Sequence, residues 1–293
     1  MEYYAYLFGS EHKGSVHNIL QTKNLVLETC AQTHRVHDLF SYIDLEFLLS
    51  ETGLKNIETI LSVVGSYIEM FKKNGPSEEI YSELLQLNEI SFKYSSKKDE
   101  YDFVCDLTER LDLEEKELLL RTDVTRPFNK KLVKEYEEYF SFENMIVLQT
   151  GKELEIKETA IEKYFQIPYE NIHISKVYEE HFKSLEYIEK VEIPITNKFI
   201  AKNFDLVKEK ENYYTKKTDG YLLSFLRAEQ FNSPKASVRI DVCVDASLHY
   251  SNIENLLYFK LWSEYLNIEI SDLFEEASNA STSIRLKASE KAL

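Results

Sequence analysis

The chain has 293 residues, of which 43% are hydrophobic and 29% are charged, a composition that indicates a globular protein with one large or two smaller domains and excludes a disordered one. Its formal net charge of −16 at pH 7 opposes non-specific binding to a nucleic-acid backbone, although it is compatible with a local basic groove. The seven glycines are scattered singly, which argues against P-loops, Rossmann sites and nucleophile-elbow hydrolases, because the backbone in such sites must approach a ligand closely.

The first third of the chain is expected to be mostly helical. Weak alternation predicts a strand over residues 2–8, and an apolar run predicts a helix over residues 38–49. The clearest helix covers residues 54–73, where apolar side chains fall on one face. Residues 74–76, with the sequence Asn-Gly-Pro, end that helix, and Ser77 is placed to cap the next one.

Residues 90–107 are expected to form a β-hairpin. Apolar residues alternate with polar ones over residues 90–94 and again over residues 101–107, and the loop between them is polar. We therefore expect a mostly helical N-terminal region with a β-hairpin over residues 1–125, and an α+β C-terminal region over residues 126–293.

The C-terminal region alternates between predicted helices and strands. Its run of Glu135, Glu137 and Glu138 has helical periodicity and indicates a solvated helix face. The fold class is therefore α+β, with mixed helices and short, mainly antiparallel sheets. The remaining helices are expected at residues 112–120, 130–140, 159–165, 179–189, 197–207, 221–231 and 252–266, and strands at residues 145–149, 154–157, 172–177, 238–244 and 284–287.

The sequence Glu155-Ile156-Lys157 on one of these strands is a candidate catalytic site. Side chains alternate between strand faces, so Glu155 and Lys157 point to one face. A carboxylate beside an amine can hold a divalent metal and orient an attacking water. The order helix, strand, strand, helix, strand over residues 130–177 resembles the core of the PD-(D/E)xK nuclease fold. That resemblance implies Glu143 as a further acidic residue, Glu155 as a metal ligand and Mg²⁺ or Mn²⁺ as the cofactor; an exposed ion pair is the alternative.

Cys30, His34 and His37 form a second candidate metal site. Zinc prefers these ligand types, and a helix would align Cys30 with His34 and His34 with His37. A closed structural site needs four ligands, and no matching half-site follows later in the chain. The alternative is that these histidines are surface or core residues.

The predicted strand over residues 238–244 carries a third polar group. Arg239 and Asp241 share one strand face with Cys243 and Asp245. The end of this segment resembles the first strand of ribonuclease-H-like enzymes, which implies Asp245 as one of several active-site carboxylates. Too few residues follow it to supply the others, so the alternative is an Arg–Asp pair on the open face of the strand.

Arg121, Arg126, Lys130 and Lys131 form the one concentrated basic stretch of this acidic chain. It is the expected place for contact with nucleic-acid phosphates. Residues 120–127 also resemble the arginine-bearing second motif of class II aminoacyl-tRNA synthetases, the alternative being a helix exit followed by a turn.

The three cysteines form no disulfide framework and the N-terminus has no signal-peptide pattern. We therefore expect a cytosolic protein with reduced thiols and no contact with membranes. The leading interpretation is a non-catalytic interaction or regulatory protein, from a bacterial anti-phage or mobile-element conflict system, with a protein partner or as a homo-oligomer. The alternative is a metal-dependent nuclease with a PD-(D/E)xK-like core.

Overall fold

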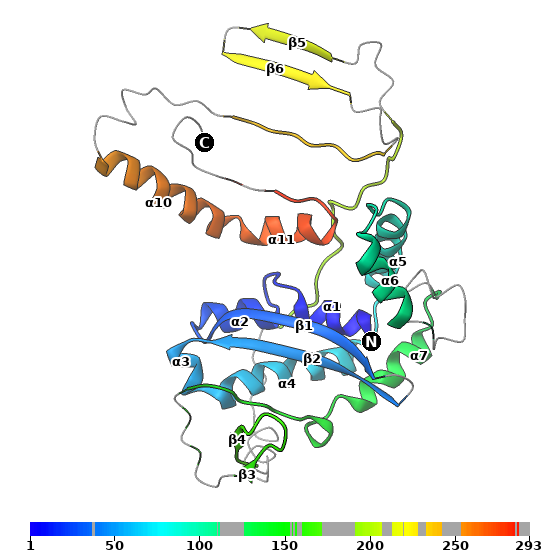
Figure 1. Ribbon diagram of the computed structural model, residues 1–293. Helices are drawn as coiled ribbons and strands as arrows, with labels where there is room; N and C mark the ends of the chain where they lie inside the picture. The colour runs from blue at the N-terminus through cyan, green and yellow to red at the C-terminus, as the bar shows by residue number, and fades with distance from the viewer. Residues whose placement is uncertain are drawn as a thin grey trace. The chain divides into compact units, whose positions relative to one another are not determined.

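The chain forms two compact units, one of Met1–Tyr81 with Pro127–Ile195 and one of Ser82–Arg126 with Thr196–Leu293. Mixed helices and short antiparallel sheets confirm the α+β class, and the predicted domain boundary at residue 125 stays a prediction. None of the described helices is long and apolar enough to span a membrane. The structure, a computed structural model (Figure 1), describes residues 1–36, 39–109, 111, 126–152, 154, 156, 160–171, 191–206, 213–218, 220–227, 233–241, 253–284 and 286.

The first unit is built on a β-hairpin and the helices around it. Its elements are α1 (Glu2–Gly9), α2 (Val16–Thr22), β1 (Val26–Val36), β2 (Phe40–Leu49), α3 (Glu51–Leu54), α4 (Ile57–Asn74), α7 (Lys130–Glu135), the 3-10 turns η2 (Tyr136–Tyr139) and η3 (Phe142–Asn144), and the short strands β3 (Ala160–Ile161) and β4 (Pro168–Tyr169). β1 and β2 pair antiparallel, from Val36 opposite Phe40 to Val26 opposite Leu49. α1 and α2 pack against β1, and α4 packs against α2 (Figure 1).

Aromatic side chains from α1 and α4 form the core of this unit. Tyr4, Phe8, Tyr67 and Phe71 are all buried. The Phe71 ring centroid lies 4.6 Å from that of Tyr67 and 5.2 Å from that of Phe8, both in edge-to-face geometry, which aromatic pairs prefer. The Tyr67 hydroxyl donates to the Leu7 carbonyl oxygen at 3.1 Å. Helix α1 is therefore held to α4 by ring contacts and a buried hydrogen bond.

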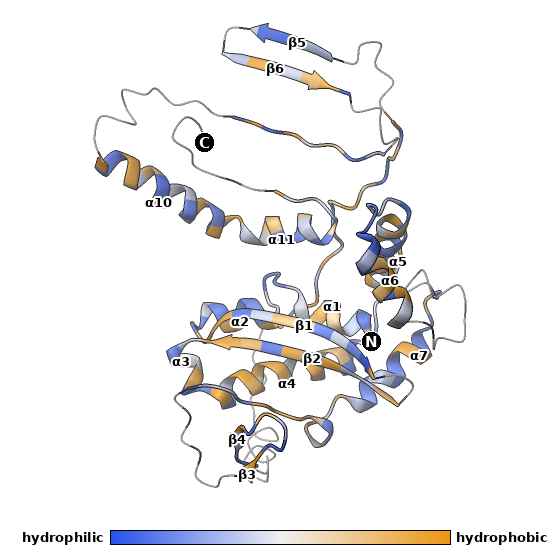
Figure 2. Ribbon diagram, in the orientation of Figure 1, coloured by the Kyte–Doolittle hydropathy of each residue, from blue (hydrophilic) through white to orange (hydrophobic). Residues whose placement is uncertain are grey.

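Helix α4 confirms the helix predicted over residues 54–73, with Gly75 at φ +68° just beyond its end. Figure 2 shows hydrophobic residues along much of this helix. Helix α1, in contrast, replaces the strand predicted over residues 2–8, and that prediction is wrong. Its buried side chains recur three and four residues apart, which is the helical period; they are Tyr3, Tyr4, Ala5, Leu7 and Phe8.

The hairpin of β1 and β2 replaces the helix predicted over residues 38–49. Ile43, Leu45 and Phe47 share one strand face and are partly buried, whereas Glu46 and Leu48 on the other face are exposed. An apolar stretch of this length fits either a buried helix or a strand, and the pairing with β1 decides the outcome.

The second unit holds the helices α6 (Glu100–Glu109), α10 (Ile253–Glu269) and α11 (Ser271–Asn279), the strands β5 (Tyr213–Thr218) and β6 (Tyr221–Leu226), and most of α5 (Glu78–Lys93). Asn197 connects α5 with α11 within this unit. Its backbone N–H donates to the Glu83 carboxylate at 3.1 Å, and its side-chain amide donates to the Glu276 carbonyl oxygen at 2.6 Å.

Two helices of the chain replace the hairpin predicted over residues 90–107. Helix α5, where the Ile80 N–H contacts the Ser77 hydroxyl as a cap, continues through Lys93, and Tyr94 beyond it stacks on Phe204 at 5.0 Å. Asp99 accepts from the Tyr101 N–H at 2.9 Å at the start of α6. Asp99, which lies in the predicted loop, therefore caps the start of a helix.

Strand β6 replaces the helix predicted over residues 221–231, and the stacked rings of Tyr214 and Phe225 lie opposite each other in its pairing with β5. Helix α10 confirms the helix at 252–266, and α7 with η2 confirms the one at 130–140. β3, which pairs with β4, and the turn after it replace the helix at 159–165. Within the described residues, 145–149 and 238–241 form no strand and 197–206 no helix. Residues 112–120, 172–177, 179–189, 285 and 287 lie outside the described part, and residues 284 and 286 are described without a strand.

Candidate functional site

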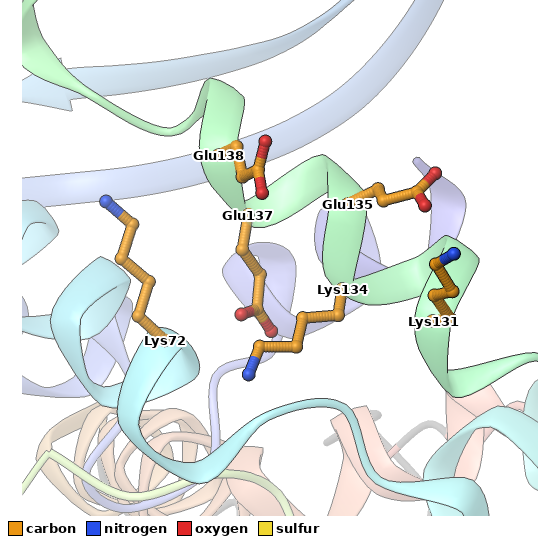
Figure 3. A pocket seen from close by; sticks show the side chains of 6 residues that line it. All are labelled: Lys72, Lys131, Lys134, Glu135, Glu137 and Glu138. Carbon is orange, nitrogen blue, oxygen red and sulfur yellow. The ribbon is translucent and has the colours of Figure 1, made fainter.

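One pocket in the first unit is lined by charged side chains of both signs. It has a volume of about 510 Å³, and Figure 3 shows the side chains around it. We call it the lysine–glutamate pocket; its residues are Lys72 from α4, Lys131, Lys134 and Glu135 from α7, and Glu137 and Glu138 from η2.

The local sequence explains how these residues reach one pocket. Asn129 caps α7, because its side chain accepts from the N–H groups of Lys131 and Leu132. After Glu135 the backbone tightens into the 3-10 turn η2. Glu137 is then buried, at 3% exposed, whereas Glu135 and Glu138 stay exposed. The prediction of a solvated face over this acidic run is therefore wrong for Glu137.

Glu137 has its hydrogen-bond partner on α1. The Tyr4 hydroxyl lies 3.0 Å from Glu137 Oε1 and 3.1 Å from the Val133 carbonyl oxygen. A phenol carries a single proton, so Tyr4 donates to one of these acceptors at a time. Burial, and then the negative charge of Glu137, raise the pKa of the Tyr4 phenol well above its ordinary value of 10.0.

Tyr4 should make the stability of the protein depend on alkaline pH. Because its pKa is higher in the folded state, the folded protein holds the phenol proton more tightly than the unfolded chain does. The resulting stability is fully present below about pH 10 and is lost as the pH rises further. Tyr4→Phe should therefore flatten the fall in the free energy of unfolding above pH 10, measured by urea denaturation at several pH values. At pH 7 we expect it to destabilise the protein by about 1–3 kcal/mol, because Glu137 loses its donor.

Tyr139→Phe is the matched control for Tyr4→Phe, since Tyr139 is 67% exposed. We expect this variant to follow the parent protein at every pH. The free energy of unfolding of Tyr4→Phe could instead fall as steeply above pH 10 as that of the parent. In that case burial and Glu137 do not hold the Tyr4 phenol in its protonated form.

The predicted Glu143, Glu155 and Lys157 site is not assembled by the residues that the structure describes. Glu155 and Lys157 lie outside them, and Glu143 is placed only by its backbone, in η3. The expected hairpin is absent over its described residues 145–152, which have no strand.

The predicted basic stretch is placed in part. Lys130 and Lys131 begin α7 and are exposed, as is Arg126, whereas Arg121 lies outside the described residues. Lys131 lines the lysine–glutamate pocket. Nucleic-acid binding by this stretch stays a prediction.

The N-terminal metal site predicted from Cys30, His34 and His37 does not form as expected. Cys30 and His34 lie on β1, where four residues span about 13 Å, too far to share one metal ion. The His34 ring instead stacks on Tyr42 at 4.9 Å. His37 lies outside the described residues. Across the part of the chain that the structure describes, no three His, Cys, Asp or Glu residues are grouped to hold a metal.

The ion pair expected at residues 239–241 is present. Arg239 Nε lies 2.9 Å from Asp241 Oδ2, with both side chains partly or largely exposed. The backbone there is not a strand, and Cys243 and Asp245 lie outside the described residues. The pair is therefore a surface interaction, which contributes little to stability.

The comparisons with known proteins all identify peptidases of the M16 family as relatives. Residues 92–293 match a family model described as the middle or third domain of peptidase M16. Insulin-degrading enzyme of Drosophila melanogaster is 24% identical over 247 residues, covering 82% of this chain and 25% of that protein. Nardilysin of Rattus norvegicus is 24% identical over 318 aligned residues, covering 100% of this chain and 26% of that protein. The chain thus spans about a quarter of the length of the curated relatives that it matches.

The fold agrees with that result. The crystal structure of pitrilysin superposes with a TM-score of 0.80 at 20% sequence identity, and the match covers 99% of this chain and 31% of that one. At this level of identity the likeness concerns the fold.

These findings overturn the function predicted from the sequence. The relatives are M16 family metallopeptidases, so the expected non-catalytic interaction or regulatory role is wrong. The alternative of a metal-dependent nuclease using Glu143, Glu155 and Lys157 is wrong as well. So are the anti-phage and mobile-element settings that were expected with these roles.

The sequence offered no short motif that leads to a peptidase. Zinc peptidases carry H-E-x-x-H or H-x-x-E-H, and neither pattern occurs among the seven histidines of this chain. With the absence of a metal-ligating group among the described residues, the residues placed by the structure do not fit a catalytic metal. The similarity to the family extends over some two hundred residues and is not concentrated in a short motif.

Proposed function

We propose that this chain, which belongs to the peptidase M16 family, contributes to peptide-bond hydrolysis as the middle or third domain of such an enzyme. The observation that carries the proposal is the match of residues 92–293 to that domain. Curated relatives that include insulin-degrading enzyme support peptides as the substrate class.

We assign the metal ligands to another part of the peptidase. Neither zinc-peptidase pattern occurs in this chain, and the relatives are between about three and four times as long. The contribution of this chain to hydrolysis is then to bind the peptide substrate and position it for cleavage.

The surface of α10 supports contact with other parts of the peptidase. Leu257, Leu261, Trp262 and Tyr265 are each between 47% and 59% exposed, and they recur at helical spacing. Figure 2 shows hydrophobic bands at intervals along this helix. Exposed apolar side chains gathered on one helix are typical of contacts between proteins or domains. The protein partner or homo-oligomer expected from the sequence is therefore proposed to be a further part of an M16 peptidase, and the cytosolic location stays part of the proposal.

The test is to purify the tagged protein from cells that produce it and to identify what it is joined to. We expect mass spectrometry to find a polypeptide region that carries a zinc-peptidase motif, either in the same chain or in a stable complex. Sedimentation should give a mass well above 34.5 kDa. A monomer of that mass with no such region would contradict the proposal.

A further inference from the structure

We propose that the lysine–glutamate pocket binds short peptides through both of their charged ends, the free ammonium group and the free carboxylate. The choice of peptides rests on the proposed function, because a peptidase generates such fragments. The site itself rests on the arrangement of charges in the first unit.

Glu137 supplies the contact for the ammonium group. Its side chain is buried and lines the pocket. Oε1 has the Tyr4 hydroxyl as its partner. Oε2 is not among the fully buried, unpartnered atoms of the described residues, and neither oxygen is in an ion pair with one of these residues. A buried carboxylate is costly unless cations or donors compensate it. A peptide ammonium group offers a positive charge and three donors.

The lysines supply the contact for the carboxylate. Lys72, Lys131 and Lys134 line the same pocket from two elements, α4 and α7 (Figure 3). The Lys72 Nζ atom lies 3.9 Å from Glu69 Oε1. Lys131 and Lys134 have no ion-pair partner within the part of the chain that is described. Charge-assisted hydrogen bonds from ammonium groups to a carboxylate are among the stronger polar contacts in proteins.

The balance of charge selects a dipolar ligand. Three lysines and three glutamates line the pocket, so a simple anion meets the glutamates and a simple cation meets the lysines. A molecule with both charges separated along its length avoids both conflicts. The volume of about 510 Å³ lies within the range of small-molecule sites and accommodates a peptide of two or three residues.

The experiment measures binding of three tripeptides to the 293-residue protein by NMR or calorimetry. Trialanine carries both charges, N-acetyl-trialanine lacks the ammonium group, and trialanine amide lacks the carboxylate. We expect trialanine to saturate the site at about 0.1–10 mM, the range for a ligand of this size. Each blocked peptide should bind at least tenfold more weakly.

Two variants locate the contacts. Glu137→Gln should weaken trialanine binding at least tenfold, and N-acetylation should then cause no further loss, because the contact is already gone. Lys131→Met should likewise weaken trialanine binding at least tenfold. Amidation of the peptide carboxylate should then cause no further loss of affinity. Glu79→Gln and Lys73→Met are the matched controls, since both residues are exposed and neither lines the pocket, and they should bind trialanine as the parent does.

Several results would overturn the inference. These are no binding of trialanine up to 10 mM, equal binding of the blocked and unblocked peptides, or undiminished binding by both pocket variants. If Glu137→Gln fails to fold, as judged by circular dichroism, the binding of trialanine and trialanine amide to Lys131→Met still tests the inference. Because no hydrolysis is measured, loss of the proposed peptidase role would leave a positive binding result intact, and the reverse also holds.

Discussion

Phe71→Ala should lower the free energy of unfolding by about 3–5 kcal/mol, the usual cost of truncating a buried phenylalanine. The side chain is 3% exposed, and its ring contacts those of Tyr4, Phe8 and Tyr67. Its removal leaves a cavity where α1 meets α4. Urea denaturation followed by circular dichroism gives the change in unfolding free energy.

Phe40→Ala is the matched control for this truncation. Phe40 is 58% exposed at the end of the hairpin, so its loss should change stability by less than about 1 kcal/mol. Equal losses in the two variants would show that the aromatic cluster is not the core of the first unit.

Gly53→Ala should destabilise the protein by about 2–3 kcal/mol. A Cβ atom at Gly53 would lie 1.9 Å from the backbone oxygen of Leu25, so helix α3 or the segment before β1 must move. The Ser50 hydroxyl ties these same segments together, donating to the Asn24 carbonyl oxygen and accepting from the Gly53 N–H. Helix propensity alone favours alanine over glycine by about 1 kcal/mol and would make Gly53→Ala stabilising. We expect the opposite, a loss of stability.

Gly151→Ala provides the comparison for Gly53→Ala. The nearest atom to a Cβ there would be in the Leu154 side chain at 3.7 Å, which is an ordinary contact. We expect a change of no more than about 1 kcal/mol in either direction. The prediction for Gly53 fails if its alanine variant is as stable as the parent in the same urea titration.

Local sequence signals predicted those elements that local interactions decide. The apolar face of α4 and its end near Gly75 are both encoded by neighbouring residues, as is the start of α7 at Lys130. The hairpin of β1 and β2 was missed because its apolar stretch fits two kinds of element until the partner strand is known. Helix α6 differs from the predicted hairpin because Asp99, which lies in the predicted loop, caps a helix.

The candidate site was predictable only where charge is concentrated in the sequence. The basic stretch led to Lys131, which lines the pocket. Tyr4 and Glu137 meet across 133 positions, and nothing in either neighbourhood indicates that contact. Glu137 was expected to be solvated because glutamates surround it, yet the 3-10 turn of η2 rotates it inward. Long-range packing of this kind cannot be read from local periodicity.

We propose that this chain takes part in peptide-bond hydrolysis, and one measurement tests this directly. The most direct measurement is the rate at which unstructured peptides are cleaved by the complex that copurifies with this chain. The rate is measured before and after the chain is removed with an antibody. We predict that cleavage copurifies with the chain and disappears from the depleted sample. Two results would contradict the proposal. One is cleavage that remains entirely in the depleted sample, and the other is a complex that contains the chain and cleaves no peptide.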